Sequence, residues 1–191
     1  MVLSVLLSQT QLLHSSVEIG SISEVRGNAQ VLRDKPYGAE LAFNIQQMDD
    51  VRTETGRVAI TFADSSTVKL TEHSKLVIDE YIYDPDPSKS KMALKFASGT
   101  ARFITGKFNN KSNISIRTPT ADIAIRGTDF TCTVDELGRS LVILLPDENG
   151  ISSGEIIVST GMGSVTLNKP YQATTVSVYE NNPTKPVTLD I

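Results

Sequence analysis

The chain has 191 residues, of which 39% are hydrophobic and 21% charged, and its formal net charge at pH 7 is −4. A chain of this length is in the size range of one domain and can bury about 70% of the surface that it exposes when unfolded. The composition excludes an intrinsically disordered chain, and the single cysteine, Cys132, excludes an internal disulfide bond. Cys132 alternates with Phe130 and Val134, so we expect a small buried strand residue rather than a reactive thiol.

Residues 1–16 form an apolar arm at the start of the chain. No Lys or Arg precedes its apolar stretch, and Gln9 and Gln11 interrupt it, which disfavours a cleavable signal segment. The arm is also shorter than the roughly 20 apolar residues that a membrane-spanning helix needs, and no later segment reaches that length. We expect the arm to pack on this domain or on a partner, with an atypical signal segment as the alternative.

The remaining chain consists of short segments in which apolar and polar residues alternate, as in half-buried strands. In chain order, the expected strands are 25–32 with a bend at Gly27, 58–62, 68–70, 76–83, 92–108, 113–125, 130–134, 141–145, 154–158, 164–167 and 173–179. Residues 141–145 are continuously apolar, which predicts a strand that is buried on both faces. Outside the arm no helical period stands out, so the sequence predicts an all-β fold.

Two segments of the chain resemble each other. Each begins with a glycine, Gly56 or Gly154, continues as a strand and a polar turn, and closes with a second strand that ends at Leu70 or Leu167. Stacked units of about 20–25 residues predict a short β-solenoid, a β-helix-like roll of stacked strands. A β-sandwich is the alternative, because meandering strands give similar spacing.

The run at 117–130, RTPTADIAIRGTDF, is the most informative segment. Pro119 marks a bend or a sheet edge, and Gly127 permits a positive φ, so we expect two short strands hinged at Gly127. For Arg126 and Asp129, which flank Gly127-Thr128, we expect a structural ion pair or arginine bonds to turn carbonyls. The residues that we take as its structural signature are Arg117, Pro119, Ile125, Arg126, Gly127, Thr128, Asp129 and Phe130.

This run and three further segments in the same order, 56–70, 76–85 and 99–107, resemble the FecR-like domain family. The resemblance covers most of the chain and divides it into the arm at 1–16, a FecR-like β domain at 17–180 and a Pro-containing tail at 181–191. It implies a protein of bacterial envelope signalling or of the cell surface, in the periplasm or outside the cell. Regulators of that family carry an anti-sigma segment and a transmembrane helix ahead of this domain. Because the sequence shows neither, we expect a stand-alone domain without the sigma-factor role.

Charge is unevenly distributed along the chain. Residues 89–126 carry eight basic side chains and one acid, Asp122, a net charge of +7, so the rest must total −11 to give −4 overall. This asymmetry favours an acidic protein partner or self-association, whereas charges scattered around the surface would favour neither. The candidate interaction surface comprises Lys89, Lys91, Lys95, Arg102, Lys107 and Lys111. Nucleic acid is not expected as a partner, because aromatic residues for base stacking are not interleaved with these cations.

No residue pattern predicts catalysis, a cofactor, a metal site or a small-molecule substrate. His14 and His73 stand outside any nucleophile or metal motif. The acidic cluster at 79–86 lacks the spacing of a calcium loop, and it is the one dense group of carboxylates on which a glycoside hydrolase site would depend.

We therefore expect a non-enzymatic protein-binding or assembly module. The alternative is a structural subunit of a larger assembly, such as a phage particle or a surface layer, in which the arm and the tail clamp neighbouring subunits. The tail can also add an edge strand, because Val187, Leu189 and Ile191 alternate with other residues.

Overall fold

The structure is a computed structural model that describes residues 19–84, 86–106 and 113–190. Ladders link its strands into one continuous mixed sheet, which confirms the all-β prediction. The arm at 1–16, together with Lys107 and Lys111, lies outside the described residues. In chain order the elements are β1 Gly20–Arg26, β2 Ala29–Leu32, β3 Pro36–Gly38, β4 Asn44–Ile45, β5 Asp50–Thr53, β6 Arg57–Phe62, β7 Thr67–Leu70, β8 Lys75–Ile82, the 3-10 helix η1 Pro87–Lys89, β9 Lys91–Ile104, β10 Asn113–Arg117, β11 Asp122–Arg126, β12 Asp129–Val134, β13 Ser140–Leu144, β14 Glu155–Ser159, β15 Ser164–Leu167, β16 Gln172–Val176 and β17 Val187–Thr188.

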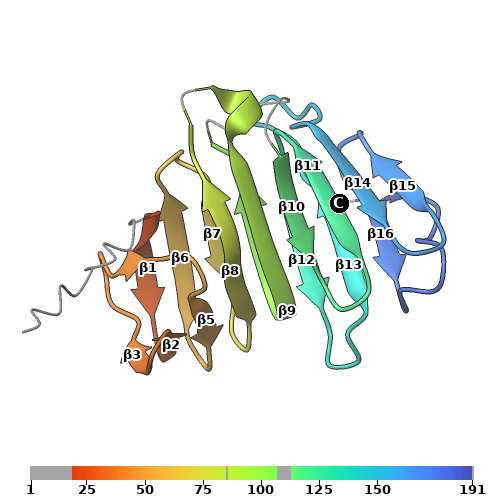
Figure 1. Cartoon of the computed structure of the whole chain (residues 1–191). Helices are drawn as coiled ribbons and strands as arrows, with labels where there is room; N and C mark the ends of the chain where they lie inside the picture. The colour runs from red at the N-terminus through yellow and green to blue at the C-terminus, as the bar shows by residue number, and fades with distance from the viewer. Residues whose placement is uncertain (1–18, 85, 107–112, 191) are drawn as a thin grey trace, which may run out of the picture.

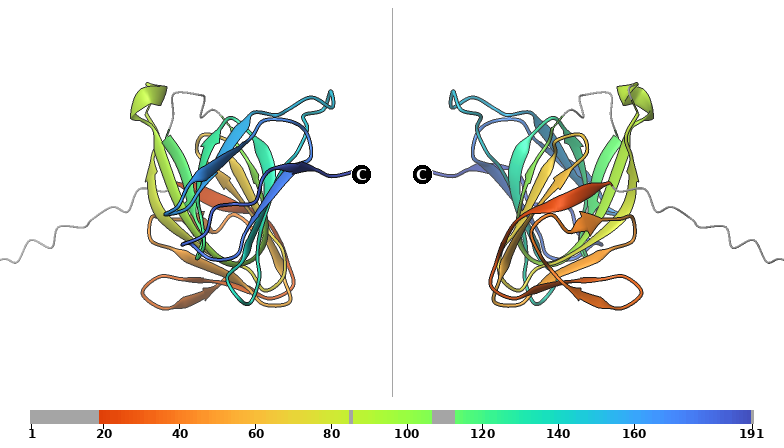
Figure 2. Two further views of the ribbon diagram at one scale, coloured as in Figure 1. Left: turned by 90° about the vertical axis from the view of Figure 1, so that its right-hand side faces the viewer. Right: turned by 90° about the vertical axis from the view of Figure 1, so that its left-hand side faces the viewer.

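The strands lie in two facing layers that share β9 (Figures 1 and 2). We call the layer ordered β4-β1-β6-β7-β9-β12-β13-β16-β17 layer A and the layer ordered β3-β2-β5-β8-β9-β10-β11-β14-β15 layer B. The first part of β9 pairs with β8 and β10, and its last part pairs with β7 and β12. Gly99 (φ +93°) stands between the two parts. Glycine is required at this position, because a Cβ would lie 2.5 Å from the Cα of Ser74.

The inward faces of both layers form one hydrophobic core. Phe62 of layer A stacks on Tyr81 of layer B with ring centroids 5.4 Å apart, and Phe103 stacks on Phe130 at 5.0 Å. Each large apolar side chain that is fully buried stabilises the fold by about 1.5–3 kcal/mol. Cys132 belongs to this core, as its alternation with Phe130 predicted.

A buried polar contact also joins the two layers. The Tyr81 hydroxyl donates to Asp64 Oδ1 over 3.0 Å and accepts from the Asp64 backbone N–H, also over 3.0 Å. The hydroxyl and backbone N–H of Ser66 donate to the same carboxylate, and Asp64 is fully buried. Burial raises the pKa of Tyr81, and the nearby charge of Asp64 raises it further.

Replacing Tyr81 with Phe tests this contact. We expect Y81F to lose about 1–3 kcal/mol of unfolding free energy at neutral pH, because Asp64 keeps its burial and loses a donor. The folded-state pKa of Tyr81 lies above its ordinary value of 10.0, so its contribution is complete below pH 10.0 and is lost as the pH rises further. Urea unfolding at about pH 7 and about pH 11 therefore gives a smaller difference between the two proteins at the higher pH. A difference that is equal at both pH values would contradict the assignment.

Two glycine-lined crossings repeat along the stack. The chain leaves β1 at Gly27 (φ +67°) and crosses from layer A to layer B, and it leaves β11 at Gly127 (φ +54°) and crosses from layer B to layer A. Gly56 lies against the first crossing and Gly154 against the second. Gly56 leads into the hairpin β6–β7, and Gly154 leads into the hairpin β14–β15. The repeat seen in the sequence is therefore a repeat in the structure, and the hinge predicted at Gly127 is confirmed.

Some strand predictions were wrong in detail. Residues 113–125 form two antiparallel strands, β10 and β11, because the chain turns at Pro119. The strand expected to be buried on both faces alternates instead: Val142 and Leu144 lie in the core, whereas Leu141 and Ile143 face outward from layer A and are half-buried. The short strands β3, β4 and β5 were not predicted. In the tail, β17 pairs with β16 of its own chain.

Candidate interaction surface

The outer face of layer A carries a continuous row of side chains across neighbouring strands. Strand register places Glu24 of β1 beside Ala59 of β6, then Lys69 of β7, Arg102 of β9 and Thr131 of β12. Side chains that are directly opposite in antiparallel strands lie about 4.5–5.5 Å apart at Cβ, so these residues act as one surface.

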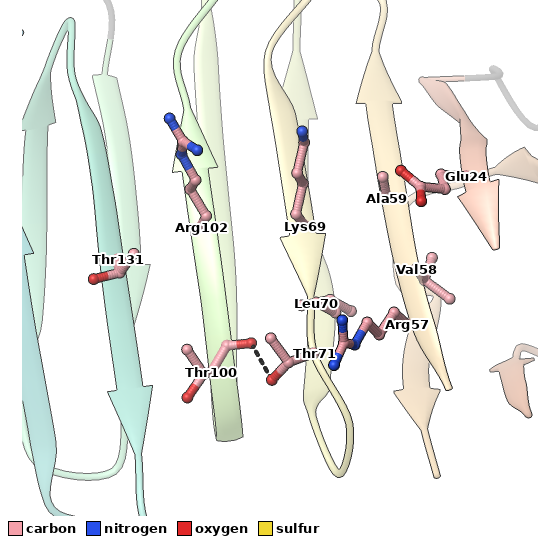
Figure 3. Close-up of a pocket in the computed structure, with 10 residues that line it drawn as sticks. All are labelled: Glu24, Arg57, Val58, Ala59, Lys69, Leu70, Thr71, Thr100, Arg102 and Thr131. Carbon is pink, nitrogen blue, oxygen red and sulfur yellow. Dashed lines mark hydrogen bonds between the residues drawn. The ribbon is translucent and has the colours of Figure 1, made fainter. Parts of the chain in front are cut away.

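A groove of about 290 Å³ lies in this surface (Figure 3). Ala59 forms its floor, because a methyl group stands where the flanking positions carry the long side chains of Glu24 and Lys69. Ala59 is only 5% exposed although it faces outward. The aliphatic stems of Lys69 and Arg102 add apolar area to one side of the groove, while their charged ends remain near solvent.

A second row of residues borders the groove and fixes its shape. Arg57, Thr71 and Thr100 line the groove, and Thr133 is opposite Thr100 in the strand register. The Thr71 hydroxyl donates to the carbonyl oxygen of Thr100 over 3.0 Å, and the hydroxyls of Thr100 and Thr133 are 3.0 Å apart. Short β-branched side chains held in this way present a surface that needs little rearrangement on binding.

The cations around the groove differ in their pairing. Arg102 forms a bidentate ion pair with Asp129, at 2.8 and 2.5 Å, and these hydrogen bonds raise the pKa of Arg102. Arg57 lies 3.3 Å from Glu72. Lys69, which is exposed, has no ion-pair partner among residues 19–84, 86–106 and 113–190.

The ion pair expected between Arg126 and Asp129 is not formed. Arg126 lies 3.3 Å from Glu155 on layer B, whereas Asp129 binds Arg102 on layer A. The chain changes layers at Gly127, so the two residues face outward on opposite sides of the molecule.

The other signature residues have structural surroundings. Ile125 and Phe130 belong to the core, and Arg117 lies 2.8 Å from Asp122. The threonines on either side of Pro119 both bond to the Ser140 hydroxyl, over 2.7 Å each, and so attach this turn to β13. Thr128 is buried, and its hydroxyl oxygen has no hydrogen-bond partner in the part of the chain that the structure describes.

Four of the cations predicted to form an interaction surface lie among the described residues, and these four do not share one face. Lys91 and Lys95 lie on the outer face of layer B, 2.6 Å from Glu80 and 2.8 Å from Asp79. Lys89 is in η1, and Arg102 is on layer A.

The structure describes no group of three or more His, Cys, Asp or Glu side chains placed to hold a metal ion within residues 19–84, 86–106 and 113–190. Burial raises the pKa of the Cys132 thiol to about 12, so the thiol is protonated at neutral pH. His73 lies in a turn with φ +55°. Within the same residues, no helix is long and apolar enough to cross a membrane.

Sequence reasoning missed Glu24, Ala59 and Lys69 as site residues. Alternation in β6 and β7 was a usable signal, because it places Ala59 and Lys69 on the outward face of one hairpin. Their proximity to Arg102 had no local signal, since it depends on the pairing of β7 with β9.

Residues 49–147, just over half of the chain, match the family described as FecR protein. The chain belongs to the FecR family. The match includes β6, β7, β9 and β12, the strands that carry most of the groove.

Two crystal structures of a candidate anti-sigma factor from Parabacteroides distasonis ATCC 8503 resemble this FecR chain, each with a TM-score of 0.57 and 15% sequence identity. Each alignment covers 74% of this chain and 60% of the other, so the chain spans 60% of the length of that protein. At this identity the likeness concerns the fold. No curated protein matches the sequence.

Proposed function

We propose that this FecR chain is a non-enzymatic protein-binding module that docks a protein partner on the outer face of layer A. The groove above Ala59 is the observation that carries the proposal. It combines an apolar floor, polar edges and a rigid sheet, which is the composition of a protein-binding site with a small anchoring pocket. Its strands lie mostly within the segment that matches the family.

A role in envelope signalling, in the periplasm or outside the cell, is part of this proposal. It is supported by membership of the FecR family and by the name of the structurally similar protein, a candidate anti-sigma factor. In such a role the domain acts by binding. The side chains of the groove are already held in place by the sheet, so binding a partner that fits costs little conformational entropy.

We also propose that the two layers form a short solenoid-like roll, with a domain at 17–180 between the arm and the tail. Three observations support the roll over an ordinary β-sandwich. Strand number rises from β1 onward in layer A and from β2 onward in layer B, the chain alternates between the layers, and the crossings at Gly27 and Gly127 repeat. Such a stack places its outward faces side by side as continuous binding surfaces.

A structural subunit of a larger assembly is the second candidate function. It is supported by the C-terminal end of the stack, where β15 pairs with β14 alone and β17 with β16 alone among the described strands, so that both edges are open. The tail gives less support as an inter-subunit clamp, because Thr184 already bonds to Thr174 and Thr175 of its own chain.

The groove is tested by filling it. Thr131 is replaced by Trp, and Thr166, which faces outward from layer B, is replaced by Trp as the matched control. Folded wild-type protein is used to select binders from a library of random short peptides displayed on phage, and the recovered peptides are measured on all three proteins. We expect T131W to weaken binding at least about tenfold, since the indole occupies the groove, and T166W to leave it unchanged. Peptides that bind T131W as well as wild type, or a library that gives no binder, would count against this surface.

A further inference from the structure

We propose that the groove on layer A recognises an extended acidic segment of its protein partner, and that Lys69 holds a carboxylate of that segment. This inference rests on the proposed function, since it specifies the chemistry of what the groove binds. The charges around the groove carry the argument.

Lys69 and Arg102 are directly opposite each other on neighbouring antiparallel strands, and their side chains extend side by side (Figure 3). Like charges in this position destabilise a sheet unless an anion lies between or beside them. Asp129 neutralises Arg102 with two hydrogen bonds, whereas Lys69 forms no ion pair within the described part of the chain. An external carboxylate would therefore gain the most electrostatic stabilisation beside Lys69.

The outer face of layer B gives a comparison, because its cations are paired with acids of the same chain. Lys91, Lys95 and Arg117 border a second groove there, and each lies within 2.8 Å of an acid of this chain. A carboxylate arriving at layer B would have to displace one of these partners. At Lys69 it displaces none, so layer A is the face on which charge favours an acidic ligand.

The shape of the site favours an extended segment. Ala59 forms an apolar floor beside Lys69, and Glu24 stands on the opposite side of that floor. Glu24 repels a carboxylate, so an acidic side chain is directed to the Lys69 side while an apolar neighbour can lie over Ala59. Side chains two residues apart on an extended backbone share one face, so an acidic and an apolar residue at this spacing fit these positions.

The test uses three synthetic peptides of equal length with the repeat Ser-Val-Ser-X, in which X is glutamate, glutamine or lysine, so that valine and X lie on the same face of an extended backbone. Their affinities for the folded full-length chain are measured by fluorescence anisotropy at low and high salt. We expect the glutamate peptide to bind at least about fivefold more tightly than the glutamine peptide, and this ratio to fall with added salt. In the charge-reversed variant K69E we expect the order to invert, so that the lysine peptide binds most tightly.

K169E is the matched control, because Lys169 is exposed, lies before β16 and undergoes the same change of charge. K169E is expected to keep the preference for glutamate. The inference is overturned if wild type does not prefer the glutamate peptide, or if K69E and K169E reduce that preference equally, which would indicate net charge alone. If T131W retains the full preference, the groove itself is the wrong surface and the proposed function fails at this site. If T131W abolishes binding of all three peptides but wild type binds them equally, the groove stands and only its acidic specificity is lost.

Discussion

Replacing Gly154 with Ala is expected to destabilise the protein by about 3 kcal/mol or more, the largest effect that we predict for a single methyl group. A Cβ at this position would overlap the carbonyl oxygen of Gly127 and approach that of Arg126 within 2.5 Å. Both atoms are backbone at a crossing between the layers, so they cannot move without shifting β11 or β12. Gly56→Ala is expected to cost a similar amount, because a Cβ there would lie 2.5 Å from the carbonyl oxygen of Asn28 at the equivalent crossing.

Gly38→Ala is the matched control. Gly38 lies in β3, and a Cβ at this position would meet no atom within 4 Å. We expect this substitution to change stability by less than about 0.5 kcal/mol. Unfolding in urea, monitored by circular dichroism, measures all three variants on one scale. If G154A and G56A were as stable as G38A, the close packing of the two crossings and the structural repeat built on them would be wrong.

The all-β fold and the hinge of the signature could be predicted because both depend on neighbours in the sequence. Alternation of apolar residues identifies most strands, and Gly127 stands where two such strands meet. Pro119 was recognised as a bend or a sheet edge for the same reason, since proline acts on the residues beside it, although 113–125 was still expected to be one strand. Of the strands that were missed, β3 has three residues and β4 has two, which is too short to show a period.

The pairing of charges could not be predicted in the same way. Arg126 and Asp129 are close in the sequence, which favoured an ion pair between them, but the crossing at Gly127 turns them to opposite faces. The groove likewise depends on a long-range pairing, because the pairing of β7 with β9 places Lys69 beside Arg102. Sequence alternation determines whether a side chain faces outward, whereas long-range strand order determines its neighbours.

An ion pair with a buried carboxylate at the N-terminal end of the stack is the second position where a large effect is expected. Asp49, just before β5, is fully buried and receives two hydrogen bonds of 2.7 Å from Arg33, which follows β2. The backbone N–H of Gln46 donates to the same carboxylate over 2.8 Å. The Arg33 guanidinium also lies 5.5 Å from the centre of the Phe43 ring. These contacts hold together the ends of β2 and β5 and the loop between them.

Arg33→Ala is expected to destabilise the protein by about 3 kcal/mol, because it leaves the carboxylate of Asp49 buried without its cation. Arg33→Lys should recover only part of this loss, since an ammonium group cannot form the two parallel bonds that a guanidinium makes. Arg26→Ala is the control: its pair with Glu24 is exposed, so we expect a change of less than about 0.5 kcal/mol. The double variant in which Arg33 is replaced by Ala and Asp49 by Leu separates the two causes of the loss. If the buried charge is the cause, the double variant is more stable than R33A, and if the lost packing of Arg33 on Phe43 is the cause, it is not. Urea unfolding of the four variants distinguishes these results, and an R33A protein as stable as R26A would show that Asp49 does not need its partner.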